Sequence, residues 1–358
     1  MAWEQEQGCR ALLDIAQQGR LEAHTAARAL EAVLKAMEHH PGEYGVRLAG
    51  VCAMERLCAG HEKNVLLLLE LDGIQVIVKA MAEFSDRQSL QEVGCKILRN
   101  LTACNSDCQS KVACYGGIQA VLRAMSTHPS VASIQELGCR ALRELAAYSA
   151  TNQEDIVACG GIQRVLRAME NHQTMPSIQV LGCGVLRNLT ACNADHQEAV
   201  ISRGGVEVVL DAMSTHAESA DVQRAGCWAL FCACVHNVEM QKVVEAHGAV
   251  KAALTAMENH RNQAPVQEAG CWVIKELAKQ IVLNQPRTTF VATTQAAMKA
   301  MEKHMVAAAV QTAAGGALRS LATHDRTGWV QTVCLGRCGR FGRTGTRQAL
   351  SAIKEESE

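Results

Sequence analysis

A unit of 44 residues recurs along most of this chain and constrains its fold more than any other feature. An Ala-Met pair occurs once in each unit, and its methionines are Met37, Met81, Met125, Met169, Met213, Met257 and Met301. A glycine recurs at the same spacing at Gly50, Gly94, Gly138, Gly182, Gly226 and Gly270, with Ala314 in the seventh unit. Such a period predicts a repeat protein, in which neighbouring units stack to bury one continuous core.

Each unit contains three predicted helices, as the fourth unit shows. Asn152 begins a short helix as its N-cap, and Gly160-Gly161 ends that helix in a turn that requires a positive φ. Residues 162–169 have the apolar spacing of an amphipathic helix, and a third helix runs from about 177 to 189. The recurring glycine costs this third helix about 1 kcal/mol relative to Ala, so we expect another backbone to pass close to it.

Composition favours a helical, intracellular protein. Hydrophobic residues make up 48% of the chain and aromatic residues only 3%, so Ala, Leu, Val and Cys must fill the core, as closely packed helices allow. Six of the 17 cysteines occupy one repeated position, directly after the recurring glycine or its equivalent, where Cys acts as a small buried hydrophobe. The start of the chain has no signal-peptide pattern, and its apolar runs, such as 65–69, are too short for a membrane span. We expect a cytoplasmic monomer, with the nucleus as a further compartment.

These residues resemble armadillo repeats, whose unit is a short helix, a Gly-rich turn and two longer antiparallel helices. The matching elements are Gly160-Gly161-Ile162, Val165-Leu166, Ile178-Gln179 and the segment 186–189. The resemblance covers about residues 1–323, as seven units preceded by a lone third helix at 6–16. It implies an all-α, right-handed α-solenoid whose third helices line a concave groove. HEAT repeats are the alternative, but their Asp/Arg turn signatures are absent. Residues 324–358 are expected to form a flexible tail that contains Gly and Arg.

In importin-like armadillo proteins, Trp and Asn lie four residues apart on the third helix and grip extended basic peptides. Here the Trp position holds Cys52, Lys96, Arg140, Gly184, Trp228, Trp272 and Gly316, and the Asn position holds Arg56, Asn100, Glu144, Asn188, Cys232, Glu276 and Ser320. Because Trp and Asn never occur together in one unit, recognition of nuclear-localisation signals is not favoured.

The third-helix positions still predict a groove that binds a protein or peptide partner. Trp228 and Trp272 are its candidate anchors, because Trp dominates binding hot spots; the alternative is that both rings pack between helices. The position one turn before the Trp position adds further charged residues. The predicted groove residues are Glu92, Lys96, Asn100, Glu136, Arg140, Glu144, Asn188, Arg224, Trp228, Glu268, Trp272 and Glu276.

No catalytic, cofactor or metal motif stands out, so an enzyme is not expected. A histidine follows the Ala-Met pair in six units, at His40, His128, His172, His216, His260 and His304. Successive copies would lie about 10 Å apart, too far to share one metal ion, so we interpret these histidines as donors to free carbonyl groups at the end of the second helix.

The sequence leaves several functions open. The main hypothesis is a non-catalytic scaffold that holds a partner segment in the groove. The alternatives are the armadillo portion of a larger signalling protein, for instance a kinase-associated one, and a nuclear-transport adaptor. Nucleic-acid binding is not expected, apart from weak contacts through Arg337, Arg340 and Arg343 of the tail.

Overall fold

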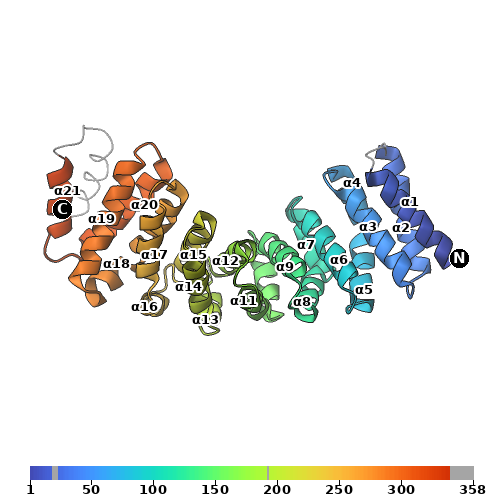
Figure 1. The fold of residues 1–358 in the computed structure, drawn as a ribbon, viewed down its shortest axis with the longest axis horizontal. Coiled ribbons are helices and arrows are strands. Elements are labelled where there is room, and N and C mark those ends of the chain that lie inside the picture. The colour runs from blue at the N-terminus through green and yellow to red at the C-terminus, as the bar shows by residue number, and fades with distance from the viewer. Residues whose placement is uncertain (18–22, 192, 339–358) are drawn as a thin grey trace. The chain divides into compact units, whose positions relative to one another are not determined.

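The computed structural model describes residues 1–17, 23–191 and 193–338, which form twenty-one helices and no strand (Figure 1). The helices group into two compact units, residues 1–172 and 173–358. The predicted all-α class is therefore confirmed. None of the helices in the described part of the chain combines the length and the apolar character that a membrane span requires. The predicted division into 1–323 and 324–358 stays a prediction; within the latter, Trp329–Cys338 is helical, whereas Arg340 and Arg343 lie outside the described residues.

Each of the two compact units is a stack of helical repeats, with three helices in the central repeats and two in the end repeats. The first unit contains α1 (Ala2–Gln17), α2 (Ala23–His39), α3 (Tyr44–Cys58), α4 (Glu62–Glu70), α5 (Gly73–Glu83), α6 (Gln88–Thr102), α7 (Ser106–Cys114), α8 (Gly117–Thr127), α9 (Ala132–Leu145), α10 (Ala150–Ala158) and α11 (Gly161–Asn171). The second contains α12 (Pro176–Thr190), α13 (Ala194–Ile201), α14 (Gly205–Thr215), α15 (Ala220–Cys232), α16 (Val238–Ala246), α17 (Ala249–Asn259), α18 (Ala264–Asn284), α19 (Arg287–Lys303), α20 (Ala308–His324) and α21 (Trp329–Cys338).

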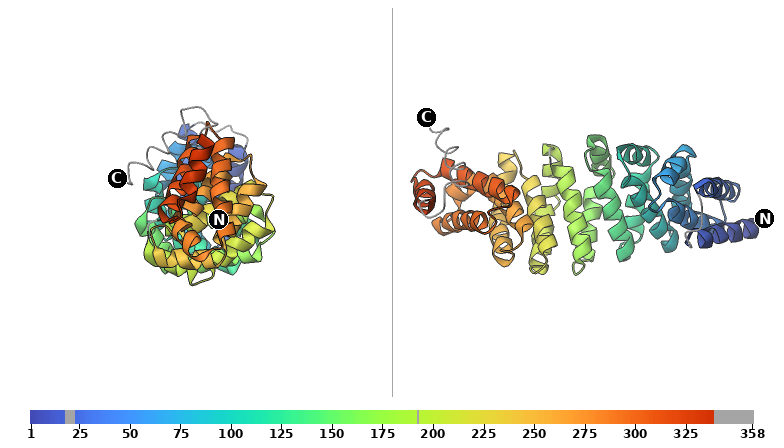
Figure 2. Two further views of the ribbon diagram at one scale, coloured as in Figure 1. Left: turned by 90° about the vertical axis from the view of Figure 1, so that its left-hand side faces the viewer. Right: turned by 90° about the horizontal axis from the view of Figure 1, so that it is seen from above.

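The third helices of consecutive repeats pack directly on one another. In the first unit α1, α3, α6 and α9 follow one another in contact, and in the second unit α12, α15, α18 and α20 do the same (Figure 2). Their buried sides carry the repeated cysteines Cys9, Cys95, Cys139, Cys183, Cys227 and Cys271. The predicted role of these cysteines as small buried hydrophobes is confirmed.

The turn between the first and second helices needs glycine for two reasons. Gly160 has φ 76°, a left-handed conformation that strains any residue with a Cβ. A Cβ on Gly161 would lie 2.7 Å from the Ile156 carbonyl oxygen, so the second glycine allows the two helices to approach. The end repeats lack this pair. Arg28-Ala29 and Ala292-Thr293 take its place, and the continuous helices α2 and α19 run through these positions.

The start of the fourth repeat differs from the prediction. Ser149, and not Asn152, is the N-cap of α10, because its side chain accepts the Asn152 N–H at 3.3 Å. Asn152 is buried, and its Nδ2 donates to the Leu145 carbonyl oxygen at 2.9 Å. The Asn side chain therefore ties the first helix to the end of the preceding third helix.

The recurring glycine of the third helix faces a methionine side chain, so the expectation of a close backbone was wrong. A Cβ on Gly138 would lie 2.6 Å from Cγ and Sδ of Met125, the methionine of the same repeat. The same methionine–glycine pairing occurs at Gly50, Gly94, Gly226 and Gly270. The recurring methionine and the recurring glycine thus contact each other, and the flexible thioether of the methionine fills the space that a Cβ on the glycine would occupy.

Glutamine side-chain amides donate hydrogen bonds to the backbone carbonyl groups at the C-terminal ends of the second helices. Gln135 Nε2 donates to the carbonyl oxygens of Met125 and His128 at 2.9 and 2.8 Å. Gln91, Gln223, Gln267 and Gln311 make the equivalent pairs. These bonds satisfy carbonyl groups that a helix leaves without an intrahelical partner.

The repeated histidines bond backbone carbonyl groups, as predicted, but the carbonyl belongs to the preceding repeat. His128 Nε2 donates to Ser85 O at 2.9 Å, and His260 Nε2 donates to Ala217 O at 2.8 Å. His172, His216 and His304 make the same link. Each bond joins the loops of two neighbouring repeats.

Candidate partner-binding surface

Three aromatic rings gather on the third helices of the second unit. The ring centroids of Trp228 on α15 and Trp272 on α18 lie 6.4 Å apart, and Phe231 lies 5.7 Å from Trp228 and 5.6 Å from Trp272. All three side chains are only partly buried. The two predicted anchors therefore stabilise each other by ring contact and still present apolar surface to solvent. Trp228, Phe231 and Trp272 are called the aromatic patch below.

Two cations lie over the rings of the aromatic patch. The Arg187 guanidinium carbon is 5.5 Å from the Trp228 ring centroid, and Lys275 Nζ is 4.2 Å from the Trp272 centroid. Both distances fall within the range of cation–π attraction. Gly316 on α20 leaves room for the lysine, because a Cβ there would lie 3.1 Å from Lys275 Cδ.

Sequence reasoning missed Arg187, Phe231 and Lys275, although they share one position. They lie three residues after the Trp position, on the next turn of the third helix. Down the chain this position holds Glu55, Arg99, Arg143, Arg187, Phe231, Lys275 and Arg319. A comparison of this position across the repeats would have shown that most copies are basic, and that Phe231 lies between Arg187 and Lys275 in the series.

The other predicted residues of the second unit have different surroundings. The Arg224 guanidinium is 3.5 Å from the Asp221 carboxylate on the same helix. The Glu276 carboxylate oxygen Oε1 accepts the backbone N–H of His236 at 2.9 Å and Nε2 of Gln241 at 2.7 Å, so it holds the loop that leads into α16. Asn188 and Glu268 are partly buried on α12 and α18.

In the first unit, the predicted residues Lys96 and Asn100 contact the buried carboxylate of Glu55. The Glu55 side chain is 5% exposed; its Oε1 lies 3.3 Å from Lys96 Nζ and accepts Asn100 Nδ2 at 3.2 Å. Glu55 lies on α3, whereas both partners lie on α6, so the cluster links two repeats. Its charges and amide are satisfied within the protein.

The remaining predicted residues of the first unit are charged and partly buried. Arg140 lies 3.4 Å from the Glu136 carboxylate, one turn away on α9. Arg143 lies 2.6 Å from the Glu144 carboxylate. Glu92 is partly buried on α6. This surface is therefore polar, and its opposite charges lie close together in pairs.

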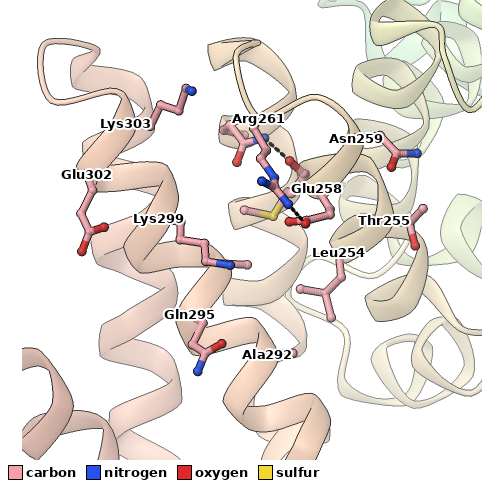
Figure 3. A pocket seen from close by; sticks show the side chains of 13 residues that line it. Leu254, Thr255, Glu258, Asn259, Arg261, Ala292, Gln295, Lys299, Glu302 and Lys303 are labelled. Carbon is pink, nitrogen blue, oxygen red and sulfur yellow. Dashed lines mark hydrogen bonds and ion pairs between the residues drawn. The ribbon is translucent and has the colours of Figure 1, made fainter.

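A cavity of ≈ 830 Å³ lies on another side of the second unit, between the second helices α17 and α19 (Figure 3). Lys299 and Lys303 line it from α19, and Arg261, which pairs with Glu258, lines it from the α17 side. Its walls mix charged and amide groups with apolar side chains such as Leu254 and Met257, and none of the described residues that line it is aromatic, in contrast to the aromatic patch.

Among the residues that the structure describes, no three His, Cys, Asp or Glu side chains gather closely enough to hold a metal ion. Burial raises the pKa of the thiols of Cys95, Cys139 and Cys227 to about 12, which keeps them protonated and unreactive. Apolar rings with adjacent cations are typical of a recognition surface.

Repeat length, helix order and glycine turns together define an armadillo-type α-solenoid. The family model described as LRRK2 ARM repeat matches residues 24–328, so the chain belongs to this family. A comparison with curated proteins finds none that matches.

Solved structures with the same fold include natural and designed proteins. One, described under "A conserved phosphorylation switch controls the interaction between cadherin and beta-catenin in vitro and in vivo", has a TM-score of 0.74 and 22% identity, over 90% of this chain and 65% of that chain. An engineered protein has a TM-score of 0.66 and 16% identity, over 99% and 96%. A designed armadillo repeat protein in complex with the peptide (KR)4 has a TM-score of 0.56 and 15% identity, over 69% and 99%. These likenesses confirm the fold.

Proposed function

We propose that this chain is a non-catalytic interaction scaffold that holds a segment of a partner protein on the third helices of its second unit. The observation that carries the proposal is the aromatic patch. Large apolar rings that stay partly exposed, with cations beside them, have the composition of binding hot spots. Eleven aromatic residues are present in the whole chain, and three of them meet at this one place.

Proteins of the same fold support a binding role. The designed armadillo repeat protein is described in complex with a peptide, and the cadherin and β-catenin structure concerns an interaction between proteins. A nuclear-transport adaptor is less favoured, because Cys232 and Glu276 occupy the Asn positions that would accompany Trp228 and Trp272. The burial of the repeated cysteines as small hydrophobes supports the further proposal of a reducing cellular location, in the cytoplasm and the nucleus.

A pull-down with matched variants tests the proposal. The intact chain, Trp228→Ala plus Trp272→Ala, and Trp3→Ala are immobilised at equal density and incubated with the same cell lysate. Trp3 is a suitable control because it is 70% exposed on α1, which belongs to the first unit. We expect the double variant to lose its partner at least about tenfold, while Trp3→Ala retains it.

Folding must be checked in the same samples, because truncating a Trp also removes packing. Circular dichroism and the melting temperature show whether the double variant keeps its helices. Trp228→Phe plus Trp272→Phe retains two rings and should recover most of the binding. Retention of every partner by a folded double-alanine variant would refute the proposal.

A further inference from the structure

The two cations of the aromatic patch have no anionic partner of their own. Arg187 is exposed and Lys275 is partly buried, and neither side chain has a hydrogen bond or an ion pair with any residue that the structure describes. Their contacts are with ring faces, which attract a cation but leave its N–H groups without acceptors. A guanidinium that lies over a ring still presents N–H donors at its edge, in the fork that matches a carboxylate.

The carboxylates of the same helices do not neutralise these cations. Asp221 is beside Arg224, and Glu276 accepts from the His236 N–H and Gln241. Glu268 is the third acidic residue on α12, α15, α18 and α20, which together carry five basic residues: Arg187, Arg224, Lys275, Lys279 and Arg319. These four helices thus carry two more basic than acidic residues, although the net charge of the whole chain is −1.

The corresponding position of the first unit shows what such a cation binds when a carboxylate is near. Arg143 there lies 2.6 Å from the Glu144 carboxylate. In the second unit the residues that follow Arg187 and Lys275 are Asn188 and Glu276, and the Glu276 carboxylate is directed to the His236 loop. Arg143 thus has a carboxylate of the protein beside it. Arg187 and Lys275 have none among the described residues, so a carboxylate of a ligand could pair with them.

From this charge complementarity we propose that the aromatic patch binds an acidic peptide segment that carries a bulky apolar side chain. The apolar side chain packs on Trp228, Phe231 and Trp272, and carboxylates on its flanks pair with Arg187 and Lys275. The inference rests on the proposed function, and it adds the chemical class of the partner. It is opposite in charge to the (KR)4 peptide of the designed armadillo protein.

Fluorescence anisotropy with defined peptides tests the charge of the partner. The probe is a fluorescein-labelled peptide with a central Leu-Phe pair between glutamates, and its counterpart has lysines in place of the glutamates. Both are titrated with the intact chain, with Arg187→Glu plus Lys275→Glu, and with Lys299→Glu plus Lys303→Glu. The last variant makes the same change of charge in the same unit, but on the α19 side that lines the cavity (Figure 3).

We expect the intact chain to prefer the glutamate peptide, and we expect Arg187→Glu plus Lys275→Glu to raise the Kd for it at least about tenfold. The α19 variant should change this Kd less than about threefold. Absence of binding, equal or tighter binding of the lysine peptide, or an equal effect of the two charge-reversal variants would each overturn the acidic assignment. The proposed function would survive such a result if the pull-down still depended on Trp228 and Trp272.

Discussion

The third helices of the two units use equivalent positions in different ways. In the first unit Lys96 and Asn100 bind the buried Glu55 carboxylate, and Arg143 lies beside Glu144. In the second unit Trp228 and Trp272 occupy the position of Lys96, and Arg187 and Lys275, at the position of Arg143, lie over these two rings. One scaffold thus supports a surface on which Lys96, Arg140 and Arg143 lie beside carboxylates, and another on which Arg187 and Lys275 lie over rings.

The two surfaces differ in whether their charged groups already have partners of opposite charge within the protein. A carboxylate beside an arginine replaces much of the hydration that both groups lose, so an added peptide gains little there. A ring with solvent on one side and a cation without an anion both gain free energy when a partner covers them. We therefore expect a partner to bind where rings remain exposed and cations have no anionic partner within the protein.

The largest effect on stability is expected at the buried carboxylate of the first unit. In Lys96→Met plus Asn100→Leu, Glu55 would keep its charge but lose both partners, so the free energy of unfolding should fall by about 2–3 kcal/mol. Urea unfolding followed by circular dichroism measures the change. Adding Glu55→Gln to this variant should restore part of the stability, because the buried charge is then gone. If the double variant is as stable as the intact chain, Glu55 is not held as described.

An intermediate effect is expected within the aromatic patch. Trp228→Ala and Trp272→Ala each remove ring contacts with the other two rings, so their effects on the free energy of unfolding should not add. A double-mutant cycle should give a coupling of about 0.5–1.5 kcal/mol. Strict additivity would show that the rings act independently, and the patch would then not be one preformed surface.

The smallest effect is expected for the partly exposed pair of Arg143 and Glu144. A double-mutant cycle with alanine should give a coupling of about 0.2–1 kcal/mol, which should shrink in about 1 M salt. The coupling between Trp228 and Trp272 should change much less with salt, because it is mainly apolar. Equal salt dependence of the two couplings would remove the distinction between the two surfaces.

Much of the architecture could be predicted from the repeated residues. Gly160-Gly161 marked the turn between the first two helices, and the predicted third helix at about 177–189 corresponds to α12 (Pro176–Thr190). Local conformational preferences decide such features, so one stretch of sequence contains the necessary information. The error at Asn152 is instructive: its side chain suits an N-cap, but Ser149 takes that role, and Asn152 bonds to Leu145 of the preceding helix.

The binding surface was predicted less completely. Trp228 and Trp272 could be selected because both occupy the Trp position of a third helix. Arg187 and part of the surroundings of Phe231 could not be assigned from their own helices, since Arg187 lies over Trp228 and Phe231 contacts Trp272, each one repeat away. Lys275 lies over Trp272 of its own helix, three residues earlier, so its spacing was open to sequence analysis. The charged residue Glu276 looked equally available in the sequence, yet it holds the loop at His236.

The sequence by itself determined the helical repeat, its 44-residue period, its glycine turns and the positions that line the third helices, because these depend on local conformational preference and regular spacing. Only the tertiary structure decided what those positions do. In the folded chain the Met125 side chain packs against Gly138, and the Lys96 ammonium lies beside the Glu55 carboxylate. The Arg187 guanidinium lies over the Trp228 ring and has no carboxylate of the described residues beside it. Whether a side chain is satisfied depends on neighbours that stacking brings from another repeat, and that proximity exists only in the folded chain.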